Sequence, residues 1–508
     1  MKKDNILAVS VLLLAIFLCS LFSFKEGVLS ISLFSIFFSI IGMGIVRAAS
    51  KGFNRDYLVK LFLWGYSLRI LITITLYLLL ITFRGEPFLG GGDDFFYNKI
   101  GEILSEIWVS SGFYSLGQLP ELAYRSFDPG YFYVNAFFRY ISNYIGGGHL
   151  AVPILFNCLI GALIPIYVYK IAFRVYNEKI ANISALFAAF FPTMVLYSSV
   201  LLKDTIIIFL ITLIAWYTVN FHLGKNKYSL VMLALLAVPI AYLRGNIFLP
   251  LSLFVALCVL LSSISSRNGK ITRVPAAISI IAMGIVFFSY QAEQIEGGKV
   301  TFRVSQSLEK SKNFLEFMKQ KASTLEKEPM LGGKSITSLI YNSPWPLSPL
   351  LRPLSLLIMP FPPWGPVAKT ALSGSWIPII EFPGLVWYIL MPLWAFGLIY
   401  SIREKRLASF FVYGLNILCF SMVGYVEIGV RHRLMGMPLA LILAAVGITY
   451  GPAFRRLVPL YVVFYSLLVL IYLFLKYEDT LPLQFLSKTG IIILITAYII
   501  WKISSFRR

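Results

Sequence analysis

The chain has 508 residues, of which 58% are hydrophobic and only 13% are charged, and its mean hydropathy is +0.80. This composition excludes a water-soluble globular protein and indicates a polytopic membrane protein. In a soluble protein the formal net charge of +21 would suggest a nucleic-acid partner. Here the informative property is how that charge is distributed among loops, and no nucleic-acid partner is predicted.

Apolar runs long enough to cross a bilayer as helices recur along the chain. They cover residues 6–24, 28–46, 57–83, 149–171, 180–200, 205–221, 229–243, 247–263, 274–290, 382–402, 407–426, 434–450, 457–475 and 490–504. The sequence therefore predicts an all-α polytopic membrane protein with about 14 transmembrane helices. The first run could be a signal peptide, but no small-x-small cleavage pattern follows it, which favours an uncleaved helix.

Lysine and arginine are concentrated on alternate loops. One side of the predicted membrane receives Lys2, Lys3, Arg47, Lys51, Arg55, Arg174, Lys179, Lys225, Lys227, Arg267, Lys270, Arg273, Arg403, Lys405, Arg406, Arg455, Arg456, Arg507 and Arg508. The positive-inside rule predicts that this side is cytoplasmic. We therefore expect a protein of the cytoplasmic (inner) membrane with both termini inside and the two long polar loops, 84–148 and 291–381, facing outward.

These loops divide the chain into four predicted parts. They are an N-terminal transmembrane hairpin (1–56), a core module that includes the first outer loop (57–290), the second outer loop (291–381) and C-terminal transmembrane helices (382–508). In the first loop, we expect glycines 90–92 to break the preceding helix. Two interfacial helices should follow, an amphipathic one from Phe96 to Ile107 and an aromatic-rich one over 132–144.

The second outer loop carries an apolar stripe at helical spacing from Val304 to Leu325, which predicts an amphipathic helix on the headgroups. A proline-rich but apolar segment, 343–366, follows it. Because proline removes a backbone donor and breaks helices, its part 350–359 is predicted to be re-entrant or interfacial.

The residue types present restrict metal and disulfide chemistry. All four cysteines lie in apolar runs, so the outer loops have no disulfide framework. With three histidines and no cysteine in a polar loop, a nitrogen- and sulfur-liganded metal site is disfavoured. A Mg²⁺ or Mn²⁺ ion with oxygen ligands at Asp93 or Asp94 stays open.

Two adjacent carboxylates, Asp93 and Asp94, follow the three glycines at the rim of the predicted membrane. They can cap the helix that follows, or one can cap it while the other projects into a cavity. Three other outer hairpins also hold ionisable groups, namely Lys203, Asp204, Arg244, Glu427, Arg431, His432 and Arg433. Each could be an ordinary headgroup anchor, but cations close to two acids suit a phosphate next to a group that loses a proton.

Four motifs occur in the order found in GT-C membrane glycosyltransferases. They are Gly-Gly-Asp-Asp-x-x-Tyr ending at Tyr97, then Asp128-Pro129-Gly130-Tyr131, then Phe191 to Ser199 with Lys203-Asp204, and finally Arg431-His432-Arg433-Leu434 with Pro438. Over residues 57–450 the chain resembles the family 39 and ArnT-like enzymes, which use polyprenyl-phosphate sugars. It differs in an extra hairpin at 6–46 and in Asp94, where many relatives have glutamate.

The resemblance implies an inverting sugar transfer at the outer face, from a polyprenyl-phosphate donor to a hydroxyl of a glycan, lipid or protein acceptor. Asp93 corresponds to the presumed general base, with Asp94 as its neighbour. Arg431 and Arg433 suit the donor phosphate because a guanidinium can bind it bidentately, and Lys203 and Arg244 are second choices. The remaining candidate site residues are Tyr97, Asp128, Asp204, Glu427 and His432.

Two alternatives remain. An O-antigen-polymerase-like or ligase-like enzyme generally has its key arginines and histidine in a later outer loop, whereas 291–381 has few arginines and no histidine. A transporter or lipid flippase should have internal repeats or polar residues at mid-membrane. Here the polar groups are concentrated at the outer rim, which favours the glycosyltransferase.

Overall fold

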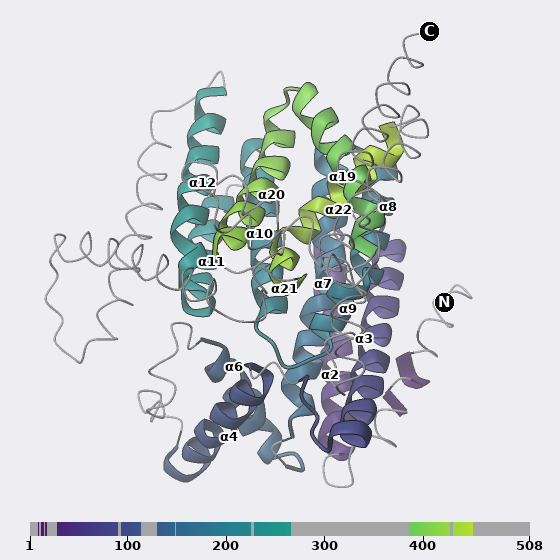
Figure 1. Cartoon of the computed structure of the whole chain (residues 1–508), viewed down its shortest axis with the longest axis vertical. Helices are drawn as coiled ribbons and strands as arrows, with labels where there is room; N and C mark the ends of the chain where they lie inside the picture. Colours follow the sequence, from purple (N-terminus) through teal and green to yellow (C-terminus); the bar gives the residue numbers. More distant parts are fainter. Residues whose placement is uncertain are drawn as a thin grey trace, which may run out of the picture.

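The computed structural model describes residues 28–89, 93–112, 130–147, 149–224, 228–265, 386–426 and 430–450, with a few positions between 9 and 17. Within these ranges all regular structure is helical and no strand occurs (Figure 1). Six of these helices are long and apolar enough to cross a membrane, or seven if one bent pair is a single span. The all-helical membrane fold is therefore confirmed.

The predicted count of 14 spans is not confirmed. The spans predicted at 274–290, 457–475 and 490–504, most of the first span and the second outer loop lie outside the described residues. Elsewhere the predicted runs correspond to helices with closely similar limits, which are α2 (Val28–Ala49), α3 (Arg55–Arg84), α7 (Ala151–Val175), α10 (Asp204–His222), α11 (Ser229–Leu243), α12 (Gly245–Ser265), α19 (Val386–Arg403) and α20 (Leu407–Val426).

Two of the predicted spans are interrupted. The run at 180–200 consists of α8 (Glu178–Phe190) and α9 (Pro192–Ser198), which are bent by 50°. Pro192 has no backbone N–H to continue the first helix but is well suited to start the second. The run at 434–450 begins earlier than expected, as a short helix α21 (Val430–Arg433) and a 3₁₀ turn η4 (Leu434–Gly436) that lead into α22 (Met437–Tyr450).

The helix before the acidic pair ends sooner than predicted. Glycines 90–92 do not break α3, because it already stops at Arg84. Gly85 follows with a φ of 74°, and its N–H bonds to the carbonyl of Ile81. This left-handed cap is a conformation that glycine adopts without a steric cost. Residues 86–89 follow, and Phe88 and Leu89 are buried.

Two helices of the first loop, α4 (Asp93–Ser111) and α6 (Gly130–Asn143), pack against each other at one end of the bundle (Figure 1). The predicted amphipathic pattern of α4 is confirmed. Lys99, Glu102 and Glu106 are exposed, and the opposite face is buried with Leu104 and Trp108 at its centre. The contact is close at Gly101, where an added Cβ would lie 2.4 Å from the Asn135 side-chain nitrogen.

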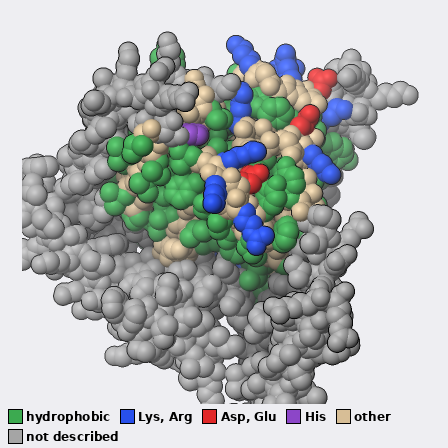
Figure 2. All heavy atoms as spheres, turned by 90° about the horizontal axis from the view of Figure 1, so that it is seen from above, with side chains coloured by type: hydrophobic (Ala, Val, Ile, Leu, Met, Phe, Trp, Pro, Cys, Tyr) green, Lys and Arg blue, Asp and Glu red, His purple; other side chains and the backbone are tan. Residues whose placement is uncertain are grey.

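The described spans place their ends alternately at the two ends of the bundle. One end holds the C-termini of α7, α19 and α22. They are joined by a hydrogen bond between the Tyr176 and Ser401 hydroxyls (2.7 Å) and by one from Nδ2 of Asn177 to the Tyr450 hydroxyl (3.0 Å). Lysine and arginine side chains are concentrated at this end, which is seen from above in Figure 2. The other end holds α21, the start of α4 and the C-terminus of α11. The acidic pair and the basic loops are therefore at opposite ends of the bundle.

Candidate active site

Arg431 joins three segments that are far apart in the sequence. Its Nε donates a hydrogen bond to Oδ2 of Asp204 at 2.7 Å, and its Nη1 bonds to Oδ2 of Asp93. The Arg431 side chain is 21% exposed, Asp93 is 52% exposed and Asp204 is fully buried. One guanidinium therefore connects the N-terminus of α4, the N-terminus of α10 and α21 through two carboxylates.

Asp204 is the buried centre of this ion-pair network. It is the first residue of α10, where the helix dipole favours a negative charge. Besides Arg431, it contacts Nη1 of Arg244 at 3.4 Å. Lys203 and His432 also interact electrostatically with it. Counting Lys203, Arg244 and Arg431 against Asp93 and Asp204, the cluster has three cations and two carboxylates, a surplus of positive charge that suits an anion.

The segment that precedes Asp204 is bound by a polar side chain from the second turn of the apolar helix α7. Nδ2 of Asn157, on α7, lies 2.9 Å from the carbonyls of Val200 and Leu202 and from the Tyr131 hydroxyl, and its two hydrogens are shared among these three acceptors. Residues 200–203 connect α9 to α10 and are buried. Asn157 thus satisfies carbonyls that would otherwise lack partners and fixes the segment that precedes Asp204.

Asp94 has a different environment from Asp93. Its side chain is buried, and its two oxygens accept N–H groups from Leu89 (2.6 Å) and Phe95 (3.0 Å). Burial raises the pKa of this carboxyl above its ordinary value, although the N–H bonds act in the opposite direction. Asp94 therefore ties residues 86–89 to the start of α4, which is the capping role considered above.

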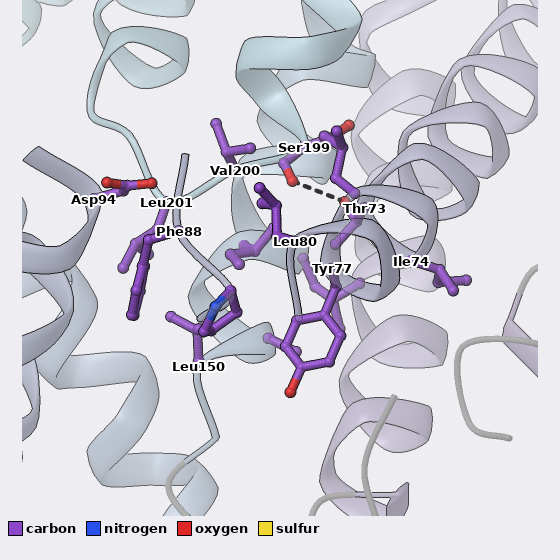
Figure 3. A pocket seen from close by; sticks show the side chains of 15 residues that line it. Thr73, Ile74, Tyr77, Leu80, Phe88, Asp94, Leu150, Ser199, Val200 and Leu201 are labelled. Carbon is purple, nitrogen blue, oxygen red and sulfur yellow. Dashed lines mark hydrogen bonds between the residues drawn. The ribbon is translucent and has the colours of Figure 1, made fainter. Parts of the chain in front are cut away.

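A small apolar pocket lies beside Asp94. Its walls come from α3, α7, the segment that follows α9 and the segment before α4 (Figure 3). The polar groups among its lining residues are few, and in Figure 3 Asp94 lies at one side of it while Thr73 and Ser199 lie at another. The two adjacent acids thus face different surroundings, Asp93 the cations and Asp94 this pocket.

Contacts between α4 and α6 hold the acidic end of α4. Tyr97 is 6% exposed, and its ring meets that of Tyr131 edge-on with 4.9 Å between centroids. The Tyr97 carbonyl accepts a hydrogen bond from Nδ2 of Asn135 at 2.5 Å. Buried Arg139 donates a hydrogen bond to Oδ1 of Asn98, the residue that follows Tyr97. This packing directs Asp93 toward Arg431.

The other predicted cation of the late motif lies elsewhere. Arg433 is 2% exposed, and its guanidinium carbon is 5.1 Å from the centre of the Trp387 ring. The structure thus brings Arg431, Arg244 and Lys203 around Asp204, whereas Arg433 stacks on α19. Asp128 and Glu427 lie outside the described residues.

Sequence reasoning missed Asn157 and the role of Tyr131. A polar amide inside a run of apolar residues was the available signal, because such groups in a membrane need partners.

For metals, the described part of the chain contains no group of three or more His, Cys, Asp or Glu side chains that could hold an ion. The predicted Mg²⁺ or Mn²⁺ at Asp93 or Asp94 stays a prediction.

Residues 129–290 match the family model described as dolichyl-phosphate-mannose-protein mannosyltransferase, a family of the GT-C superfamily. The matched region contains Asn157, Lys203, Asp204 and Arg244, but neither Asp93 nor Arg431. A comparison with the curated proteins found no match. The predicted resemblance to GT-C glycosyltransferases is therefore confirmed, and the match indicates a multi-pass membrane glycosyltransferase.

Proposed function

We propose that this chain, whose residues 129–290 match a GT-C mannosyltransferase family, catalyses an inverting transfer of a sugar from a polyprenyl-phosphate donor to an acceptor hydroxyl. The observation that carries this proposal is the position of Arg431 between Asp93 and Asp204. A candidate base and a candidate phosphate-binding cation meet in one network, with Arg244 and Lys203 beside them. Acceptors with a hydroxyl on a glycan, a lipid or a protein all fit this chemistry.

Asp93 is the residue best suited to accept the proton. Its carboxylate is half exposed, so an acceptor can reach it, whereas Asp204 is fully buried. The acceptor oxygen would lose its proton to Asp93 and attack the anomeric carbon from the face opposite the phosphate. A positioned general base typically contributes about 100- to 10,000-fold.

The cations would act on the leaving group. As the bond between the anomeric carbon and the phosphate oxygen breaks, the electron pair stays on the polyprenyl phosphate, which gains negative charge. Arg431, Arg244 and Lys203 supply fixed positive charge there, and such preorganised charge stabilises a transition state without further rearrangement. Arg431 has the most accessible position of the two arginines, since Arg244 is 7% exposed.

The charge pattern supports a site on the outer face of the cytoplasmic membrane. Lysine and arginine side chains are concentrated at the end of the bundle seen in Figure 2, and cytoplasmic loops carry such an excess. The cluster around Asp204 is at the opposite end of the helices. Labelling of single introduced cysteines near Gly85 and near Lys51 tests this orientation, and a cytoplasmic Gly85 would contradict it.

The proposal is tested with purified protein in nanodiscs that is given radiolabelled polyprenyl-phosphate mannose and an extract of envelope glycans and lipids. We expect transfer by the wild type and none by Asp93→Asn. Glu106→Gln, an exposed acid on the same helix, is the matched control and should retain activity. Full transfer by Asp93→Asn would exclude this residue as the base, and failure of the wild type to bind any polyprenyl-phosphate sugar would contradict the proposed function.

A further inference from the structure

Arg69 is a fully buried cation in the middle of α3, far from the ends of that 30-residue helix. No described carboxylate forms an ion pair with it. Its Nε donates to the Ser198 hydroxyl at 2.8 Å, and its Nη1 donates to the carbonyls of Gly65 (2.8 Å) and Ala189 (3.1 Å). A charge at this depth is costly unless it is compensated, and such residues often serve a function.

The broken helix α8–α9 provides the compensation. The last carbonyls of a helix have no intrahelical N–H partners, and they carry the negative end of its dipole. Ala189 is next to the last residue of α8, so the guanidinium bonds to one of these carbonyls at the break before Pro192. Arg69 thus replaces the missing N–H group and neutralises the end of the half-helix.

The same guanidinium also binds the second half-helix. Ser198, the last residue of α9, accepts its Nε–H. The hydroxyl of the next residue, Ser199, lies 2.8 Å from the Val195 carbonyl and 3.1 Å from the Arg69 carbonyl, so its single hydrogen is shared between the two. One turn further along α3, the Thr73 hydroxyl donates to the Arg69 carbonyl at 2.8 Å and lies 3.2 Å from the Ser199 carbonyl. Both sides of the break are therefore fastened to one turn of α3.

The Arg69 guanidinium is closely packed on the side of α7. An added Cβ at Gly161 on α7 would lie 2.6 Å from Cβ of Ser198 and 2.7 Å from Nε of Arg69. Three helices meet here at a distance that only glycine permits. The guanidinium is consequently held in one place rather than free to select other partners.

We propose that Arg69 is a positioning residue that fixes the broken helix α8–α9 and thereby holds Lys203 and Asp204 in place to organise Arg431. The connection is short, since Asn157 anchors Val200 and Leu202 directly after Ser199, and Asp204 follows. If Arg431 binds the donor phosphate, loss of Arg69 should weaken donor binding, and this consequence rests on the proposed function. The attachment of residues 192–205 to α3 does not depend on the proposed function.

Hydrogen–deuterium exchange of the full chain in nanodiscs tests the fastening, and binding of polyprenyl phosphate tests its consequence. For Arg69→Met we expect amide exchange over 192–205 to accelerate about tenfold, with α19 unchanged. The dissociation constant for polyprenyl phosphate should rise about tenfold, with Arg69→Lys intermediate. Should Arg69→Met not fold, Ser198→Ala removes the Nε acceptor and should change both readouts in the same direction.

Lys170→Met is the matched control. Lys170 is another buried cation, 5% exposed, but it lies on α7 near the basic end with its ammonium 4.2 Å from the centre of the Trp216 ring. It should leave exchange over 192–205 and phosphate affinity unchanged. Equal acceleration by Lys170→Met, or unchanged exchange in Arg69→Met, would overturn the proposal. If exchange responds as expected but the wild type binds no polyprenyl phosphate, the fastening stands and the proposed function fails.

Discussion

Arg431 and Asp93 form an ion pair across 338 positions of sequence, so the proposed phosphate-binding cation and the proposed base satisfy each other's charge. In this ion pair the guanidinium occupies a carboxylate oxygen of Asp93 that would otherwise be available to an acceptor hydroxyl. A donor phosphate that takes Arg431 would compete with Asp93 and free it. The geometry therefore favours binding of donor before acceptor.

Asp93→Asn should bind polyprenyl phosphate more tightly than the wild type while losing transfer. The substitution removes the competing carboxylate, and a half-exposed ion pair of this kind is worth about 0.2–1 kcal/mol, so the gain in affinity should be about 1.4- to fivefold. Titration of nanodisc-embedded protein with polyprenyl phosphate measures it. Weaker binding by Asp93→Asn would show that this carboxylate supports the donor site instead.

Asp94→Asn should retain most of the transfer activity, in contrast to Asp93→Asn. The Asp94 carboxyl is buried, its pKa is raised by burial, and it accepts backbone N–H groups. An amide oxygen can replace one of these interactions. Asp94→Leu removes both acceptors and should destabilise the protein by about 1–3 kcal/mol for each N–H left unpaired. Thermal unfolding and initial rates for the three variants separate the roles, and loss of transfer by Asp94→Asn at unchanged stability would contradict a capping role.

Arg431→Lys and Arg433→Lys should have different effects. Arg431 uses two N–H groups to bridge Asp93 and Asp204, a geometry that a single ammonium cannot reproduce. Its replacement should weaken binding of polyprenyl phosphate about tenfold or more. Arg433→Lys loses contact with the Trp387 ring and should lower the melting temperature without changing that affinity. Equal loss of affinity in both variants would place Arg433 at the phosphate as well.

The sequence alone could have separated these two arginines. Residues two apart on a helix point in different directions, and Arg431 and Arg433 both lie in α21. The broken helix was equally visible, because Pro192 falls inside an apolar run. The partnership of Arg431 with Asp93 and Asp204 could not be derived in this way. The distribution of lysine and arginine among alternate loops predicts that these three residues lie at one end of the bundle. Their contact, however, depends on how α4, α10 and α21 pack.

The structure also predicts a dependence of stability on pH. Nδ1 of His149 accepts the Ala151 N–H at the start of α7, and burial together with the charge of Arg139 lowers the pKa of His149 from 6.5 to about 4. Between these values the unfolded chain takes up a proton that the folded protein excludes. Stability should therefore fall as the pH drops from about 6.5 to about 4 and be unaffected at higher pH.

Melting temperatures measured at about pH 7.5 and about pH 5 test this dependence. His149→Asn keeps an acceptor for the Ala151 N–H but has no titrating group, so its melting temperature should fall less on acidification than that of the wild type. Identical pH profiles for the two proteins would mean that His149 takes up its proton equally in the folded and unfolded states.

Gly397→Ala should destabilise the protein through backbone contact between α19 and α22. A Cβ at Gly397 would lie 1.8 Å from the Leu443 carbonyl oxygen, and one at Gly447 would lie 2.1 Å from that of Leu393. Neither oxygen can move without shifting its helix. Small residues permit such close approach in membranes, where helix association depends on packing.

The expected loss for Gly397→Ala is about 1–3 kcal/mol, the usual range for overpacking. Gly44→Ala on α2 is the control, because nothing lies within 4 Å of its added Cβ and alanine favours a helix over glycine. Thermal unfolding in nanodiscs should place Gly397→Ala below the wild type and Gly44→Ala at or above it. A Gly397→Ala variant as stable as the wild type would mean that α19 and α22 pack less closely than the backbone distances require.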